Sequence, residues 1–173
     1  MFRNTHDMAT LPQLIEEDIQ KLDGILGEFI ESTDAMAALI IDKGGFLITQ
    51  QGEANDFDFT TIAALASGAF MANQTIAGLV NEKKFDSIYQ EGDHCSLFVV
   101  NVDEHCLIVV IFKSEIGVGT VKYHAIKTVK RIARQLKHAQ EREPGVGLDL
   151  SMLNVADTQN FFRKKEKEEK RKR

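Results

Sequence analysis

The sequence predicts an α/β domain of the α+β type, in which helices cover both faces of a five-stranded, mainly antiparallel sheet. Residues 14–29 and 120–136 have apolar side chains at intervals of three and four, which is the period of a helix. The short apolar runs between them are continuous rather than alternating, which indicates strands that are covered on both faces. The expected order is α-β-β-α-β-β-β-α, followed by a C-terminal tail.

The first helix and the first hairpin have ordinary start and turn signals. Pro12 stands just before the helix expected over residues 14–29, and the first turn of a helix tolerates proline. Residues 35–41 are a strand too apolar to alternate. Residues 42–45, Asp-Lys-Gly-Gly, supply a turn with glycines available for positive φ, and residues 46–50 return as the second strand.

The middle helix, expected over residues 59–80, is capped by Asp58 and differs from the other two. No charged side chain occurs in the 23 positions between Asp58 and Glu82, and most of these residues are small. Since a helix with one buried face carries charges on its outer side, more than one face is expected to be covered. Gly68 and Gly78 each cost about 1 kcal/mol relative to alanine, which close approach of another backbone would explain. A second subunit is favoured over complete burial within one domain.

Three more strands and a third helix complete the domain. The strands are expected at residues 85–90, Ser96–Val102 and Cys106–Phe112. The helix over residues 120–136 has basic residues between its apolar positions. Every apolar run then has a layer of helix above it.

Charge is distributed unevenly along the chain. The formal charge is −5, but residues 163–173 hold eight basic and three acidic residues, so the rest of the chain carries −10. An acidic body argues against nucleic acid as a partner. The basic run fits a solvated segment, with contact to an acidic partner or anionic lipid as the alternative. We expect one domain over residues 12–138, then a linker and charged tail over 139–173 with a short helix near 154–170.

The sequence predicts a cytoplasmic protein. No apolar run approaches the roughly 18–20 residues that cross a membrane. The N-terminus also lacks the apolar stretch of a signal peptide. No integral membrane segment is therefore expected.

Cys95 and Cys106 each follow a histidine, a repetition that raises the question of a metal site. With a two-residue turn between their strands, Asn101 lies opposite Cys106 and Cys95 lies opposite Phe112. About six residues of strand then separate the cysteines, which is on the order of 20 Å at ~3.3 Å per residue. That distance excludes a shared zinc ion and a disulfide. Both cysteines are expected as reduced residues of the core.

No catalytic constellation is present in the sequence. The glycines of residues 117–119 precede a helix but lack the third glycine and the Gly-Lys-Ser/Thr of nucleotide-binding loops. Asp56 and Asp58 flank a helix start, which fits capping. His124 and His138 are expected on the surface of the third helix. We therefore expect no catalytic residue, no metal and no cofactor.

Several local patterns occur in a familiar order. Residues 38–48, Ala-Leu-Ile-Ile-Asp-Lys-Gly-Gly-Phe-Leu-Ile, form a hairpin whose first strand ends in Asp. Residues 61–68, Thr-Ile-Ala-Ala-Leu-Ala-Ser-Gly, open a helix of small residues, and residues 107–112 lead into the glycines of 116–119. This ordered set resembles the roadblock/dynein light chain domain family over roughly residues 12–138. The resemblance implies the roadblock, profilin-like fold.

Within that family, the sequence resembles the bacterial MglB-like proteins, which share the acidic-then-aromatic segment found here at residues 157–162. The resemblance implies a homodimer that binds a Ras-like small GTPase of the MglA type and stimulates its GTP hydrolysis. Such a GTPase-activating protein has no active site of its own, since the dimer repositions the catalytic residues of the GTPase. The resemblance further implies a role in cell polarity or motility and concentration at a cell pole.

The resemblance places the two middle helices of the dimer side by side, with the GTPase lying across them. Positions three and four apart share a helix face, so the expected GTPase-binding stripe is Ala64, Gly68, Met71 and Thr75. Core packing is the alternative for Met71. The side that faces the sheet or the dimer mate is expected to hold Ile62, Leu65, Ala69, Ile76 and Leu79. In the tail, Phe161 and Phe162 are the expected contacts with the GTPase.

Two other functions are open at this point. One is a roadblock scaffold or adaptor that tethers a GTPase or a motor complex without activating it. The other is a small-ligand sensor of profilin-like or GAF-like shape, which the arrangement of helices on both faces of a sheet supports.

Overall fold

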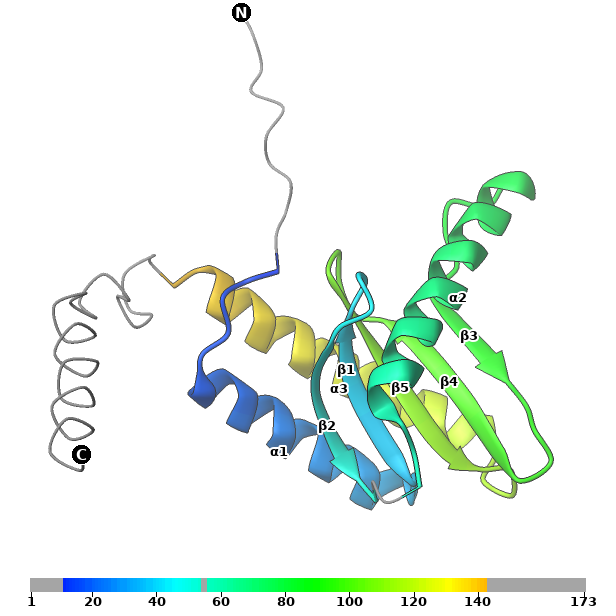
Figure 1. Cartoon of the computed structure of the whole chain (residues 1–173), viewed down its shortest axis with the longest axis horizontal. Helices are drawn as coiled ribbons and strands as arrows, with labels where there is room; N and C mark the ends of the chain where they lie inside the picture. The colour runs from blue at the N-terminus through cyan, green and yellow to red at the C-terminus, as the bar shows by residue number, and fades with distance from the viewer. Residues whose placement is uncertain (1–10, 54–55, 143–173) are drawn as a thin grey trace, which may run out of the picture. The chain divides into compact units, whose positions relative to one another are not determined.

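The computed structural model describes residues 11–53 and 56–142, which contain eight elements in the predicted order (Figure 1). Their bounds are α1 (Glu16–Thr33), β1 (Ala37–Asp42), β2 (Leu47–Gly52), α2 (Phe59–Leu79), β3 (Ser87–Gln90), β4 (Cys95–Asn101), β5 (Cys106–Lys113) and α3 (Val118–Gln140). The predicted α+β class and the order α-β-β-α-β-β-β-α are confirmed.

All eight elements belong to one compact unit that ends at Glu141. A second unit begins at Arg142, and everything beyond that residue lies outside the described part of the chain. The expected limits of the domain and the tail, and the expected short helix near residues 154–170, therefore stay predictions.

The five strands form one antiparallel sheet in the order β2-β1-β5-β4-β3. β1 and β5 lie at its centre, where they pair from Ala37 opposite Ile111 to Asp42 opposite Cys106. β2 and β3 are the edges and are less buried than the central strands. The most apolar runs of the sequence therefore occupy the positions that are enclosed on every side.

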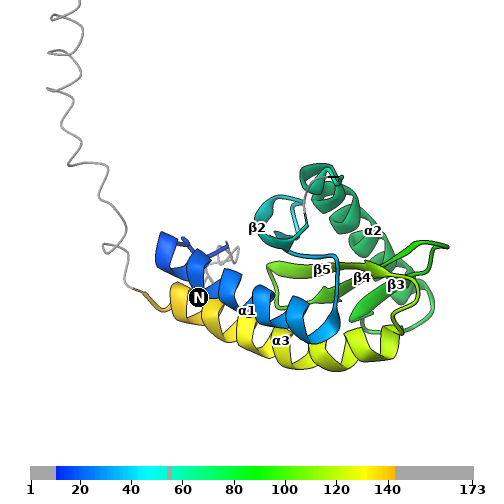
Figure 2. The same ribbon diagram turned by 90° about the horizontal axis from the view of Figure 1, so that it is seen from below.

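Helices cover both faces of this sheet, with α2 on one face and α1 beside α3 on the other (Figure 2). The residues of the central strands divide alternately between two cores, because successive side chains point to opposite faces. Ile40 and Ile108 belong to the core under α1 and α3, whereas Leu39 and Val109 belong to the core under α2. This division explains why the strands are apolar without alternation.

Two polar clusters align α1 with α3. The buried carboxylate of Asp18 accepts hydrogen bonds from the backbone N–H of Ile15 (3.0 Å) and from Nε2 of Gln135 on α3 (3.0 Å). Arg131 donates through both terminal nitrogens to the carboxylate of Glu28 on α1, at 2.5 and 3.1 Å. Its guanidinium lowers the pKa of Glu28 below the ordinary value. The two helices are thus fixed side by side as one layer.

The turn between β4 and β5 differs from the prediction. Asn101 lies opposite Leu107 rather than Cys106. The Oδ1 atom of Asp103 accepts hydrogen bonds from the backbone N–H groups of His105 and Cys106, both at 2.8 Å. Because an Asp side chain can replace a backbone acceptor within a turn, His105 is drawn into the loop and the register moves by one residue.

The two cysteines lie at opposite ends of this hairpin, in different surroundings. Cys106 is buried, whereas Cys95 is exposed and lies opposite Lys113 rather than Phe112, so the expectation that both are core residues is wrong for Cys95. Burial raises the pKa of the Cys106 thiol to about 12.

We expect iodoacetamide at about pH 8 to label only Cys95 in the folded protein, since the thiolate is the reactive form. Peptide mass mapping checks this, with unfolded protein as the control; label on Cys106 before unfolding would contradict it.

By length and composition α2 is able to cross a membrane, since its mean hydropathy reaches 1.3 over 18 residues. The expectation that no segment is long and apolar enough to cross a membrane is wrong by that criterion. The core helix of a globular domain meets the same criterion, and α2 packs along the sheet through Phe59, Ala63 and Phe70. The absence of an integral membrane segment stays a prediction.

Candidate functional site

One side of α2 lies against the sheet. Its buried apolar residues are Phe59, Ala63, Ala66, Phe70 and Ala77. They follow one another at intervals of four, three, four and seven, so they form a single stripe. The phenyl rings fill the core, while the alanines allow the helix backbone to approach the strands.

Asp58 caps the N-terminus of α2, as predicted. Its Oδ1 atom accepts a hydrogen bond from the backbone N–H of Thr61 (3.1 Å), and Oδ2 accepts one from the Thr61 hydroxyl (2.6 Å). The hydroxyl bond first, and then the backbone bond, hold the pKa of Asp58 below its usual value. The cap provides an acceptor for a backbone donor that has none within the helix, and so fixes where α2 begins.

Two further contacts fix the rotation of α2 about its own axis. The Ser67 hydroxyl donates to the backbone carbonyl of Lys43 at 2.6 Å. The Gln74 amide donates to the carbonyl of Phe85 (2.6 Å) and accepts from the backbone N–H of the same residue (3.3 Å). These bonds tie α2 to the loops beyond β1 and before β3, which determines which residues point outward.

The β1–β2 turn comes close to α2 at Gly45. This residue has a φ of +93°, and a Cβ atom there would lie 3.0 Å from the Cα of Ala64. Glycine is therefore required both for the turn and for its contact with the helix. The next residue, Phe46, is 74% exposed. Phe46 is thus a large exposed apolar residue in the turn that contacts α2, and the sequence pattern did not single it out.

The expected GTPase-binding stripe lies on the outer side of α2. Ala64, Gly68, Met71 and Thr75 are all exposed. Met71 is 47% exposed, so the core-packing alternative for this residue is wrong within the protomer. Exposure makes the stripe available to a partner, and its role in binding stays a prediction.

The second expected stripe is also largely on the outer side. Leu65, Ile76 and Leu79 are exposed, at 69%, 47% and 79%, whereas Ile62 and Ala69 are half-buried. Contact with the sheet is therefore wrong for these three exposed residues, because the stripe that contains Phe59 and Phe70 occupies that side. Contact with a dimer mate stays the prediction for them.

Gly68 and Gly78 face open space. Among the described residues, no atom that could obstruct a side chain lies within 4 Å of a Cβ atom built at either position. The protomer itself therefore does not require glycine here, although glycine weakens a helix by about 1 kcal/mol relative to alanine. Close approach of a backbone from a second protein chain would account for both glycines.

The outer side of α2 can offer apolar contact but no acid, base or fixed charge. No charged side chain occurs from Phe59 to Leu79. Large apolar side chains are exposed along it, and exposed apolar surface of this kind is typical of protein-binding sites. Within residues 11–53 and 56–142, no group of three or more His, Cys, Asp or Glu side chains could hold a metal ion. The expected tail contacts, Phe161 and Phe162, lie outside the described residues.

Comparison with known proteins gives a family and similar structures. Residues 21–112 match the family described as Roadblock/LC7 domain. The gliding protein MglB of Thermus thermophilus is 27% identical, with a TM-score of 0.69 over 73% of this chain and 96% of that one. MglB of Myxococcus xanthus is 25% identical, with a TM-score of 0.70 over 75% and 98%. An uncharacterized protein of Methanocaldococcus jannaschii is 24% identical over 116 residues, covering 67% of this chain and 96% of that protein.

Proposed function

Because the chain belongs to the Roadblock/LC7 domain family, we propose that it is a homodimeric regulator of a Ras-like small GTPase of the MglA type. It binds the GTPase through the outer side of α2 and stimulates GTP hydrolysis. It works in the cytoplasm, concentrated at a cell pole, in the control of polarity or motility.

One observation carries this proposal: a helix of 21 residues presents an uncharged, apolar outer side on a fold similar to MglB. The similarity extends over 96% and 98% of the two MglB chains. Apolar residues such as Leu65 and Met71 are exposed in the protomer and would be buried by a dimer mate or a partner.

In the proposed mechanism the chain positions segments of the GTPase and supplies no catalytic group of its own. The α2 helices of two protomers lie side by side, and the GTPase rests across them. Apolar contacts then hold the mobile switch segments of the GTPase in the arrangement that hydrolysis requires. GTPases gain several orders of magnitude in rate when their catalytic groups and the attacking water are held in place. The catalytic groups belong to the GTPase in this scheme.

The test is single-turnover GTP hydrolysis by a Ras-like GTPase of the MglA type, with and without the full chain. We expect phosphate release to accelerate at least about tenfold, well below the full effect known for activated GTPases. Binding without acceleration would instead identify a scaffold or adaptor. Failure to bind either nucleotide state would contradict both functions.

A further inference from the structure

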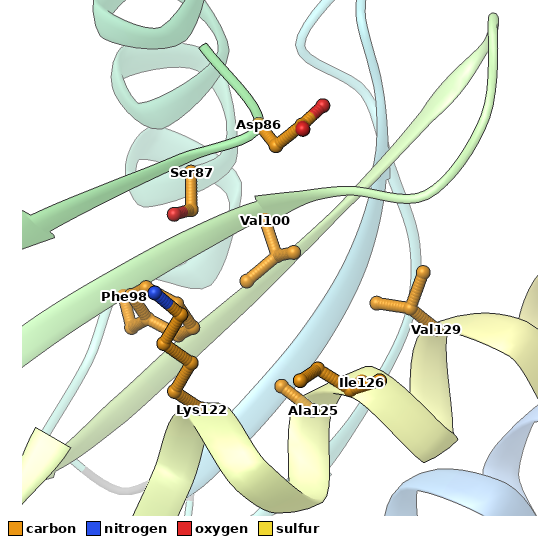
Figure 3. Close-up of a pocket in the computed structure, with 8 residues that line it drawn as sticks. All are labelled: Asp86, Ser87, Phe98, Val100, Lys122, Ala125, Ile126 and Val129. Atoms are coloured by element: carbon orange, nitrogen blue, oxygen red, sulfur yellow. The ribbon is translucent and has the colours of Figure 1, made fainter. Parts of the chain in front are cut away.

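An apolar cavity lies between α3 and strands β3 and β4, on the face of the sheet opposite α2 (Figure 3). Its volume is about 220 Å³. Phe98 and Val100 of β4 face Ala125, Ile126 and Val129 of α3 across it. Since a cavity of about 150 Å³ accommodates a benzene ring, this one has room for one large apolar side chain.

The rim of the cavity carries one unbalanced positive charge. Asp86 lies on the β3 side of the rim, where it forms an ion pair with Lys84 at 3.0 Å. Lys122 lies on the α3 side and has no ion pair within 4.0 Å among the described residues. The mouth of the cavity therefore favours a carboxylate near Lys122.

Lys122 begins a row of basic side chains along the exposed side of α3. No acidic residue occurs from Val118 to Gln140. The row, called here the basic ridge, consists of Lys122, Lys127, Lys130, Arg134 and Lys137, all exposed. Ile126 of the cavity wall stands four residues from both Lys122 and Lys130, so the cavity and the ridge adjoin.

Little within the domain neutralises this ridge. Lys137 lies 3.8 Å from Glu141, and Lys127 interacts electrostatically with Glu28. Lys122, Lys130 and Arg134 form no ion pair within the described ranges. Two apolar side chains are exposed beside them, Tyr123 at 74% and Ile126 at 55%. Unpaired cations next to exposed apolar groups are typical of a binding surface.

We propose that the cavity and the basic ridge bind an acidic segment of a partner protein. One large hydrophobic side chain of that segment fills the cavity, and its carboxylates lie along the ridge. This partner is distinct from the GTPase, because α2 and α3 cover opposite faces of the sheet. The domain then binds two proteins at once and links them.

The concave shape favours a peptide over an anionic membrane. A bilayer takes up apolar side chains that project from a helix into it. Here Phe98, Val100 and Val129 line the walls of a hollow, where a flat surface does not reach them. A peptide side chain enters the hollow, and its acidic neighbours pair with cations that remain at the surface.

The probe is the fluorescein-labelled peptide Glu-Asp-Glu-Phe-Glu-Asp-Glu, followed by fluorescence anisotropy with the full chain. We expect saturable binding that weakens as salt is raised, because the charges are solvent-exposed. Replacing the peptide Phe with Ala, or its acidic residues with Lys, is expected to weaken binding at least about tenfold. The chain variants Ile126→Asp and Lys130→Glu with Arg134→Glu are expected to have a similar effect.

The matched control is Lys83→Glu with Lys113→Glu, which makes the same charge change at exposed positions outside α3. This control is expected to bind the peptide within about twofold of the original chain. An equal loss in the control, or a dissociation constant above about 1 mM, would overturn the proposal. So would binding to phosphatidylserine vesicles without binding to the peptide. GTPase turnover is expected to be unchanged by the ridge variants. A negative result in the peptide assay therefore contradicts this proposal without contradicting the proposed function.

Discussion

The double variant Gly68→Arg with Met71→Arg is expected to bind the GTPase at least about 100-fold more weakly than the original chain. Both positions lie on the exposed side of α2, in a stretch with no charge of its own. An apolar interface would bury two guanidinium groups without partners, and an unpaired buried charge costs about 3–5 kcal/mol. Isothermal titration with the GTP-loaded GTPase measures the change.

The fold is expected to tolerate both arginines. No obstructing atom of the described residues lies within 4 Å of a side chain at Gly68, and arginine favours a helix more than glycine does. The matched control is Gln20→Arg with Gly24→Arg, which places two arginines on the exposed side of α1, where a side chain at Gly24 also meets open space. GTPase binding that survives in the α2 variant would remove the proposed stripe. Sedimentation of the α2 variant on its own distinguishes loss of the GTPase contact from dissociation of the dimer.

The order of the elements was predictable because its signals are local. Continuous apolar runs identify strands covered on both faces, and helical spacing identifies α1 and α3. The cap at Asp58 was also predictable, since a capping side chain acts within a few residues of its own position. The same holds for the Gly44–Gly45 turn, where positive φ is needed at Gly45.

The orientation of α2 was not predictable by the same means. The helix is so uniformly small and apolar that helical spacing does not separate its inner side from its outer side. The structure separates them through Phe59 and Phe70 in the core and through the bond from Ser67 to Lys43, a residue 24 positions away. The two phenylalanines, about three turns apart, were the available signal.

The cavity beside α3 depends on a contact that spacing cannot reveal. Ile126 has the period of a buried residue, but α3 is buried along Val121, Ala125, Thr128, Ile132 and Leu136, and Ile126 lies beside that stripe, 55% exposed. Sequence periodicity therefore predicts the helix, but not which of its apolar positions are buried.

The substitution Phe70→Ala is expected to lower the free energy of unfolding by about 3–5 kcal/mol, the usual result of removing a buried phenyl ring. Phe70 is 2% exposed and belongs to the core between α2 and the sheet. Because a domain of this size is stable by only about 5–15 kcal/mol, this loss is a large fraction of the total. Urea denaturation followed by circular dichroism measures it.

Tyr123→Ala is the matched control, since it also removes an aromatic ring from a helix, but from a position that is 74% exposed. Its effect is expected to stay within about 0.5 kcal/mol, as is usual at the surface. Equal losses for the two variants would contradict the assignment of the inner side of α2. If only Phe70→Ala is destabilising, the rotation of α2 is as described, and Leu65, Met71 and Leu79 must point outward. The proposed binding surface depends on that rotation, so a stability measurement on the protomer tests the geometry before any partner is identified.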